Sequence, residues 1–383
     1  MMNKRIQTII TSALLGLSIF NTSVNVLATD KMFTNHTVKS GLSQGTVFAM
    51  FQDSNGYIWI GTADGLNRYN GYEYKKYYKN SDKENSIVSN EIRTITEDKN
   101  KNLWIGTSEG ISKMNLDNYK IKNYTSNNSN ICNSDIKEIC VTKDGKVIIS
   151  SGDGLSIYDE KEDDFKRIEY NQGGSFYSLE SHEDNILYGV CDGVIFQLNT
   201  ETLAVKEINT ENLKRSLFYD MINDIIVEDN IIWIGTASKG LYKYDMNTDE
   251  ILDNKIMIKE EQDNIAYAIN HLYKDKMGNM FLATENGLVS YDVDGKENMY
   301  QYDLYDKYTI VNNNILSMMQ DSSGLMWLGT YSGISTFRPD EGVTHYGNNP
   351  NSQGEGLLGN LIHGLYEDEE GKIWAGCNGY GIC

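Results

Sequence analysis

The sequence predicts an all-β protein: a seven-bladed β-propeller of four-stranded blades, followed by the first blade of a second propeller. Three observations lead to this prediction. A motif recurs eight times along the 383 residues, each copy contains four short strand-like runs, and the composition combines 34 glycines and 26 tyrosines with only 2 prolines. Many glycines together with aromatic and β-branched residues are typical of short strands joined by tight turns. A chain of this length exceeds one ordinary compact domain unless it is built from repeats.

The first element is an export signal, residues 1–28. Lys4 and Arg5 form a basic start, an apolar stretch runs from Ser12 to Phe20, and small residues end at Ala28. This order is typical of a signal peptide. The alternative, an uncleaved anchor, needs ~20 apolar residues, and the stretch is shorter. We therefore expect cleavage after Ala28 and an exported protein at the extracellular or periplasmic face of the cell membrane.

The chain is strongly acidic. Its formal net charge is −20, and removal of Lys4 and Arg5 leaves 32 basic against 54 acidic residues, which is −22. Such a surface repels nucleic acid and anionic lipid. We expect no nucleic-acid partner, and contact with a membrane only through a helix downstream of Cys383.

The first full copy of the motif begins after a short lead-in strand at Met32–Val38. Its strand-like runs are 47–52, 57–62, 66–69 and 74–78, and Asp-x-x-Gly and Asp-Gly turns separate the first three. Four short strands per repeat are the signature of a propeller blade. The lead-in strand is expected to complete the last blade and close the ring.

The other copies follow at a blade-sized period. Five copies keep a tryptophan at the centre of the motif, whereas the third, fourth and sixth copies are degenerate there. The residues at this position, 39 to 48 residues apart, are Trp59, Trp104, Ile148, Leu187, Trp233, Phe281, Trp327 and Trp374. Asp229 is taken as the turn aspartate of the fifth copy.

Packing explains the residue types of the motif. In the first copy we expect Asp53 to accept backbone N–H groups in the turn and Gly56 to adopt a positive φ. Trp59 would fill the space between blades, Gly61 would let two sheets approach, and Gly65 would turn the chain into the next strand. One acid per blade points to architecture, so we assign no catalytic, cofactor or metal residues and leave the ligand-binding residues unknown.

Both prolines, Pro339 and Pro350, follow the seventh copy, and proline marks a junction because it cannot donate to a sheet ladder. We therefore place the closed seven-bladed ring in residues 29–340. Residues 341–383 would begin a second propeller and stop in mid-motif at Gly381–Cys383, so the chain is expected to be an N-terminal fragment.

The motif resembles one family. Gly41-Leu42-Ser43-Gln44, then Asp53, Gly56 and Trp59-Ile60-Gly61-Thr62, then Gly65-Leu66 and Tyr69 closely resemble the two-component regulator propeller repeat. The resemblance covers essentially the whole mature chain. It implies the periplasmic or extracellular sensor region of a hybrid histidine kinase or a diguanylate cyclase. It further implies a small ligand, with an oligosaccharide as a candidate, a homodimer in the full receptor, and no cofactor.

Other constellations have simpler explanations. Asp98, Asn100 and Asn102 with Glu109 mimic a calcium loop, but Leu103 stands where that loop needs glycine, and the blade turn explains the same residues. The five histidines share no blade position and no metal spacing, and we expect surface or turn positions for them. The aromatic run from Tyr72 to Tyr78 could stack sugar rings, but packing of an outer strand is favoured. Among five cysteines only Cys132 and Cys140 are close, and a disulfide between them is not favoured.

Three functions remain open. The first, which we favour, is a ligand-sensing input domain of a transmembrane receptor, with no enzymatic activity in this segment. The second is an exported propeller enzyme or binding protein acting on polysaccharide, which needs a converging carboxylate pair. The third is a secreted scaffold without a signalling role.

Overall fold

The computed structural model describes residues 31–80, 82, 85–170, 174–183, 185–208, 211–217, 220–253, 268–340, 357, 359, 361–368 and 372–382. The expected signal peptide, Pro350, His345 and Cys383 lie outside these residues. By its contacts the chain divides into two units. One comprises residues 31–343, and the described part of the other is the small sheet β29–β31.

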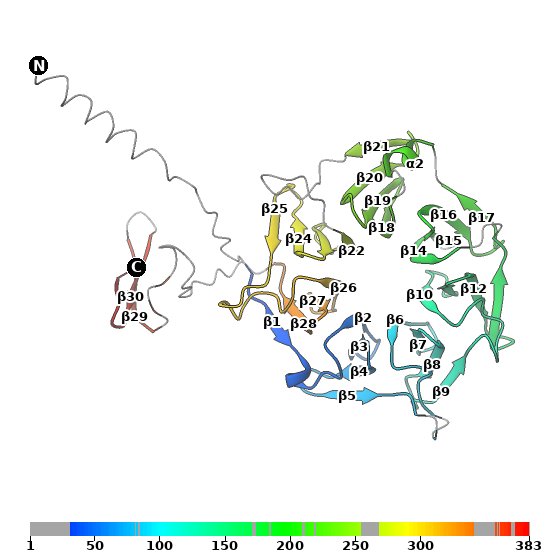
Figure 1. The fold of residues 1–383 in the computed structure, drawn as a ribbon, viewed down its shortest axis with the longest axis horizontal. Coiled ribbons are helices and arrows are strands. Elements are labelled where there is room, and N and C mark those ends of the chain that lie inside the picture. The colour runs from blue at the N-terminus through cyan, green and yellow to red at the C-terminus, as the bar shows by residue number, and fades with distance from the viewer. Residues whose placement is uncertain are drawn as a thin grey trace, which may run out of the picture. The chain divides into compact units, whose positions relative to one another are not determined.

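The first unit is a ring of seven antiparallel four-stranded sheets (Figure 1). Its first three blades are β2 (Val47–Gln52), β3 (Ile58–Thr62), β4 (Gly65–Tyr69) and β5 (Tyr74–Tyr77), then β6 (Ile92–Glu97), β7 (Asn102–Thr107), β8 (Gly110–Asn115) and β9 (Ile121–Tyr124), then β10 (Ile136–Val141), β11 (Val147–Ser151), β12 (Gly154–Asp159) and β13 (Asp164–Ile168). The predicted runs of the first copy agree with β2–β5 to within one residue.

Blades four to seven follow the same order. They are β14 (Phe176–Glu183), β15 (Ile186–Cys191), β16 (Val194–Asn199) and β17 (Val205–Glu207), then β18 (Ile222–Glu228), β19 (Ile231–Thr236), β20 (Leu241–Asp245) and β21 (Glu250–Asp253), then β22 (Ile269–Lys274), β23 (Met280–Thr284), β24 (Gly287–Tyr291) and β25 (Glu297–Tyr300), then β26 (Ile315–Gln320), β27 (Met326–Thr330), β28 (Ile334–Phe337) and β1 (Thr34–His36). Among the described residues the helical elements are the 3-10 turn η1 (Val38–Ser40) and α2 (Glu211–Leu217).

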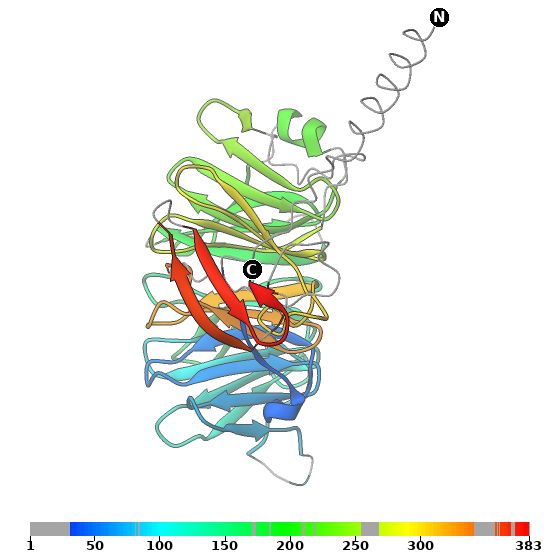
Figure 2. The same cartoon turned by 90° about the vertical axis from the view of Figure 1, so that its left-hand side faces the viewer.

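The ring closes through its N-terminal strand. β1 pairs antiparallel with β28, so Thr34 faces Thr336 and His36 faces Ile334. The expectation that the lead-in strand completes the last blade is confirmed. The innermost strands of successive blades contact one another all the way round, with β2 against both β6 and β26. Figure 2 shows the ring edge-on.

Apolar clusters between neighbouring blades form the core. Trp59 is fully buried and packs with Ile92 and Leu103 of the second blade. At the degenerate positions Ile148 and Leu187 are also fully buried. A single sheet cannot cover both its faces, so stacking of the blades is what removes these side chains from water.

Gly61 shows how closely the blades approach. A Cβ at this position would lie 2.6 Å from Cγ2 of Ile92 in the next blade. The expected role of this glycine is confirmed.

The second unit carries the same motif in a different environment. Its strands are β29 (Ile362–Glu367), β30 (Ile373–Cys377) and β31 (Gly381–Ile382). Trp374 is 47% exposed, whereas Trp59 and Trp104 are fully buried and Trp327 is 4% exposed. Seven blades and part of an eighth are therefore present, and the eighth presents the faces that stacking covers in the ring.

Candidate functional site

The turn aspartate of each strong repeat holds both the turn and the tryptophan. Oδ1 of Asp53 accepts the backbone N–H groups of Asn55 (3.0 Å) and Tyr57 (2.9 Å), and Gly56 has a φ of +86°. Oδ2 accepts the indole N–H of Trp59 at 2.7 Å. The same indole bond occurs in other blades at Asp98–Trp104, Asp321–Trp327 and Asp368–Trp374. The predicted turn role is confirmed, and the indole bond is the part that the sequence interpretation missed.

The fifth blade departs from this scheme. Asp229 lies in a two-residue turn with a φ of +51°, and the carboxylate of Glu228 accepts the indole N–H of Trp233 at 3.2 Å instead. Asp229 therefore lies in the turn as expected, but it does not bind the tryptophan as the turn aspartates of the other tryptophan-bearing repeats do. The physical reason is that this turn is shorter, which brings the residue before the aspartate level with the indole.

Acidic side chains and one histidine gather on the innermost strands of blades three to six. They are Glu138 on β10, Glu180 on β14, Asp224 on β18 and His271 on β22. Each innermost strand of the ring has a β-bulge near its start, as between Ile136 and Glu138. A bulge redirects side chains and leaves backbone groups unpaired.

The polar side chains link each blade to the next by binding these backbone groups. Glu138 accepts the N–H of Leu179 at 2.6 Å, and Asp224 accepts that of Leu272 at 2.8 Å. Asp224 also accepts Ser178 Oγ at 2.7 Å and lies 3.1 Å from Nδ1 of His271. Part of this cluster is therefore structural.

The protonation states of the cluster are shifted from their ordinary values. Burial, reinforced by the charge of Asp224, raises the pKa of Glu138 to about 8 and that of Glu180 to about 7. Burial lowers the pKa of His271, but the adjacent Asp224 outweighs burial and raises it to about 9. For Asp224, hydrogen bonds and the His271 charge outweigh burial and lower the pKa.

This arrangement can present hydrogen-bond donors and acceptors to a polar ligand. At neutral pH His271 is positive and Asp224 negative, while Glu138 and Glu180 hold protons for part of the time. His271 keeps 37% of its side-chain surface exposed, so solvent reaches the cluster. Carboxyl groups whose pKa values are perturbed by burial and by neighbouring charges are common at functional sites. We take the cluster as the candidate ligand site.

Two of the expected surface histidines lie elsewhere. His271 belongs to this cluster, and His36 on β1 stacks on Trp327 at 5.9 Å and lies 3.1 Å from the Tyr74 hydroxyl. Both therefore lie on strands and contact other blades, and His271 is still partly exposed. Sequence periodicity could not place them, because their partners come from other blades.

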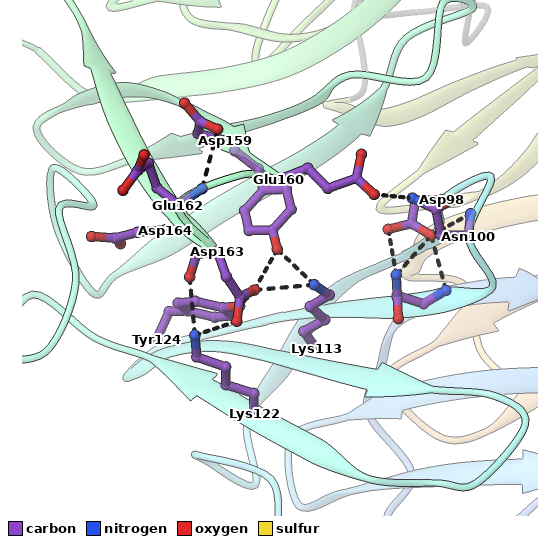
Figure 3. Close-up of polar contacts among 12 residues, drawn as sticks. Asp98, Asn100, Lys113, Lys122, Tyr124, Asp159, Glu160, Glu162, Asp163 and Asp164 are labelled. Carbon is purple, nitrogen blue, oxygen red and sulfur yellow. Dashed lines mark hydrogen bonds and ion pairs between the residues drawn. The ribbon is translucent and has the colours of Figure 1, made fainter.

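A second polar network fills the seam between blades two and three (Figure 3). Asp163 lies in the β12–β13 turn with a φ of +47°. Its carboxylate accepts Lys122 Nζ at 2.6 Å, Tyr124 OH at 2.7 Å and Lys113 Nζ at 3.3 Å, and it also accepts Tyr158 OH. These donors outweigh burial and lower the pKa of Asp163. The network joins two blades with a fully paired carboxylate.

The calcium alternative is not supported by the contacts. Asp98 uses Oδ1 on the N–H groups of Asn100 and Asn102 and Oδ2 on Trp104, as Figure 3 shows in part. Glu109 pairs with Lys79. Among the described residues no group of three or more acidic, histidine or cysteine side chains is placed to hold a metal ion.

Two further expectations concern the cysteine pair and the aromatic run from Tyr72 to Tyr78. Cys132 and Cys140 are both free thiols. In the aromatic run, Tyr74 and Tyr77 pack inward, with Tyr69 stacked on Tyr74 at 4.6 Å, whereas Tyr72 is 94% exposed. Outer-strand packing thus accounts for Tyr74 and Tyr77, but not for Tyr72, and Tyr78 is 42% exposed.

Comparisons with known proteins identify the repeat. The model for the two component regulator propeller matches residues 41–64, 86–109, 309–332 and 356–379, each a lead-in with the first two strands of a blade. The repeats at these four positions are thus two-component regulator propeller repeats, as the motif indicated.

Similar proteins extend this result. Histidine kinase P4 of Formosa agariphila is 28% identical over 196 residues, which are 48% of this chain and 14% of that protein. An extracellular domain assigned to a hybrid two-component system of B. thetaiotaomicron is 20% identical with a TM-score of 0.68, over 92% of this chain and 53% of that one. Virginiamycin B lyase of Staphylococcus aureus is 12% identical with a TM-score of 0.61, over 80% and 99%. At these identities the two structures show the propeller fold alone, and this chain spans only part of the first two proteins.

Proposed function

We propose that this chain is the extracytoplasmic ligand-sensing input domain of a transmembrane signal-transduction receptor. The observation that carries the proposal is the regulator-type repeat, found in four places along a chain that also resembles a histidine kinase. Within the described residues no helix is long and apolar enough to span a membrane. The membrane helix and the output module, a histidine kinase or a diguanylate cyclase, are proposed to follow Cys383.

The candidate mechanism is a shift in population. A polar ligand, with an oligosaccharide as the candidate, would bind the Glu138–His271 cluster across several blades. Its differential affinity for two arrangements of a receptor homodimer would bias the output. This segment would perform no chemistry itself.

The first experiment reads the gene beyond the codon for Cys383. Further Trp-Ile-Gly-Thr repeats, a membrane helix and a kinase or cyclase domain are expected. A reading frame that ends after the second propeller, or continues into a hydrolase, would overturn the receptor proposal. In the full receptor, Glu138→Gln is expected to weaken the response to an oligosaccharide by about tenfold, because loss of one hydrogen bond to the ligand costs ~1.4 kcal/mol.

An exported enzyme acting on polysaccharide is the second candidate. Two carboxyl groups with pKa values displaced in opposite directions, such as Glu138 and Asp224, are the pattern of an acid–base pair. Against it, the Asp224 oxygens are occupied by Ser178, Leu272 and His271. Cleavage of a polysaccharide that Glu138→Gln abolishes would favour this candidate over the receptor input domain.

A further inference from the structure

The seam between the first two blades resembles the seam of Figure 3 in the positions of its two cations and one tyrosine. In the first blade Arg68 on β4 pairs with Lys75 on β5. In the second blade Lys113 on β8 pairs with Lys122 on β9 at the equivalent position. Tyr77 opposes Leu66 as Tyr124 opposes Ile111. Two cations and a tyrosine hydroxyl therefore occupy equivalent positions in both seams.

The residue that faces these groups differs between the two seams. Ile121 of the second blade and Phe165 of the third occupy equivalent positions in their strand pairs. Tyr119 lies two residues before Ile121, and Asp163 lies two residues before Phe165, so the two are structurally equivalent. Tyr119 and Asp163 also share the left-handed conformation, with φ values of +57° and +47°. A tyrosine in the first seam thus stands where the second seam has a carboxylate.

Because a tyrosine stands in place of the carboxylate, the positive charges of the first seam are not neutralised. Arg68 donates to the Tyr119 hydroxyl and stacks on rings, 4.3 Å above Tyr57 and 5.2 Å above Tyr119. Lys75 lies 5.2 Å from the Tyr77 ring. Within the described part of the chain neither cation forms an ion pair, and Arg68 Nε and the Tyr77 hydroxyl are buried without a hydrogen-bond partner.

A hollow of about 280 Å³ opens beside these cations. Its lining residues are Arg68, Asn70, Glu73, Tyr74 and Lys75. Two positive groups and one negative group give the lining a net positive charge in a chain of net charge −20. The volume lies near the ~300 Å³ lower end of ligand pockets, which suits a small molecule. The exposed Tyr72 ring belongs to the turn between Asn70 and Glu73.

We propose that this hollow binds a small organic carboxylate, whose charge replaces the one that Asp163 supplies in the next seam. Arg68 and Lys75 hold the carboxylate by charge-assisted hydrogen bonds, and Tyr72 provides an apolar surface for the body of the ligand. Binding here is independent of the Glu138 cluster. This proposal rests on the proposed receptor function only in one respect: the bound carboxylate is taken to be a signal for the receptor.

The test exploits the internal comparison. Isothermal titration of the full chain with glucuronate, glucose and inorganic phosphate should show binding of glucuronate alone, weakening as salt increases. Tyr119→Asp places a carboxylate where the second seam has Asp163, in a backbone conformation that Asp163 already adopts, and should weaken glucuronate binding at least tenfold. Lys75→Gln should weaken it by a similar factor.

Two controls separate the site from general stability. Tyr119→Phe should retain glucuronate binding because it introduces no carboxylate. Asp163→Asn disrupts the neighbouring seam and should lower stability without changing binding. The proposal is overturned if glucuronate does not bind, if phosphate or glucose binds equally well, or if Tyr119→Asp binds like the unaltered chain. A receptor that still responds to another ligand after such a result would leave the proposed function standing and this site refuted.

Discussion

At the scale of single residues, one carboxylate per repeat stabilises a turn and an inter-blade tryptophan together. Asp53 is 4% exposed and accepts two backbone N–H groups and the indole of Trp59. We expect Asp53→Asn to lower the free energy of unfolding by about 1–3 kcal/mol, because the amide presents an N–H to one of these buried donors. Urea unfolding followed by tryptophan fluorescence measures the change.

The matched control is an aspartate without such donors. Asp117 is 69% exposed and lies 3.7 Å from Lys101, so Asp117→Asn should change stability by less than about 0.5 kcal/mol. Equal effects of the two substitutions would contradict the role given to Asp53. The six-residue spacing from Asp53 to Trp59 can be read from the sequence. That Glu228 and not Asp229 binds the tryptophan of the fifth blade depends on turn geometry and cannot be read from the sequence.

At the scale of elements, the innermost strands combine support of the ring with proton binding. The raised pKa values of Glu138 (about 8), Glu180 (about 7) and His271 (about 9) mean that the folded chain binds these protons more tightly than the unfolded one. The bound protons stabilise the folded chain fully at a pH below the pKa values of the unfolded chain, ~4.5 for the two glutamates and ~6.5 for the histidine. This stabilisation is lost as the pH rises through the pKa values of the folded chain. We expect the free energy of unfolding to fall between pH 5 and pH 9, by about 1–2 kcal/mol per group after allowance for solvent screening.

Urea titrations at several pH values test this slope, with Glu138→Gln as the diagnostic variant. The amide can still accept the N–H of Leu179 but cannot ionise, so the decline between pH 5 and pH 8 should become shallower. A slope that the substitution leaves unchanged would refute the assignment. The strands themselves follow from periodicity and turn residues. The cluster does not, because its members lie 42 to 47 residues apart and meet only after bulges redirect them.

At the scale of the whole molecule, stacking of blades explains both the ring and the small second unit. The blade count and the closing strand could be predicted because each repeat carries its own strand pattern. Which seams bear unmatched charge could not, since this depends on pairs such as Arg68 and Tyr119 from different repeats. The exposed Trp374 fits our proposal that residues 341–383 begin a second propeller, because Trp59, Trp104 and Trp327 are buried where a neighbouring blade covers them.

Closure by β1 gives the last prediction. Phe33 is 2% exposed, packs 5.0 Å from Phe337 and 5.7 Å from Tyr300, and donates its N–H to Tyr308 at 2.8 Å. Phe33→Ala should lower the free energy of unfolding by about 3–5 kcal/mol, as for other buried aromatic residues. Because β1 joins the two ends of the ring, the loss should also expose the first and seventh blades to limited proteolysis before the others. Met32→Ala, at a side chain that is 37% exposed, is the control and should cost less than about 0.5 kcal/mol. Equal stability and cleavage patterns for the two variants would show that β1 does not hold the ring closed.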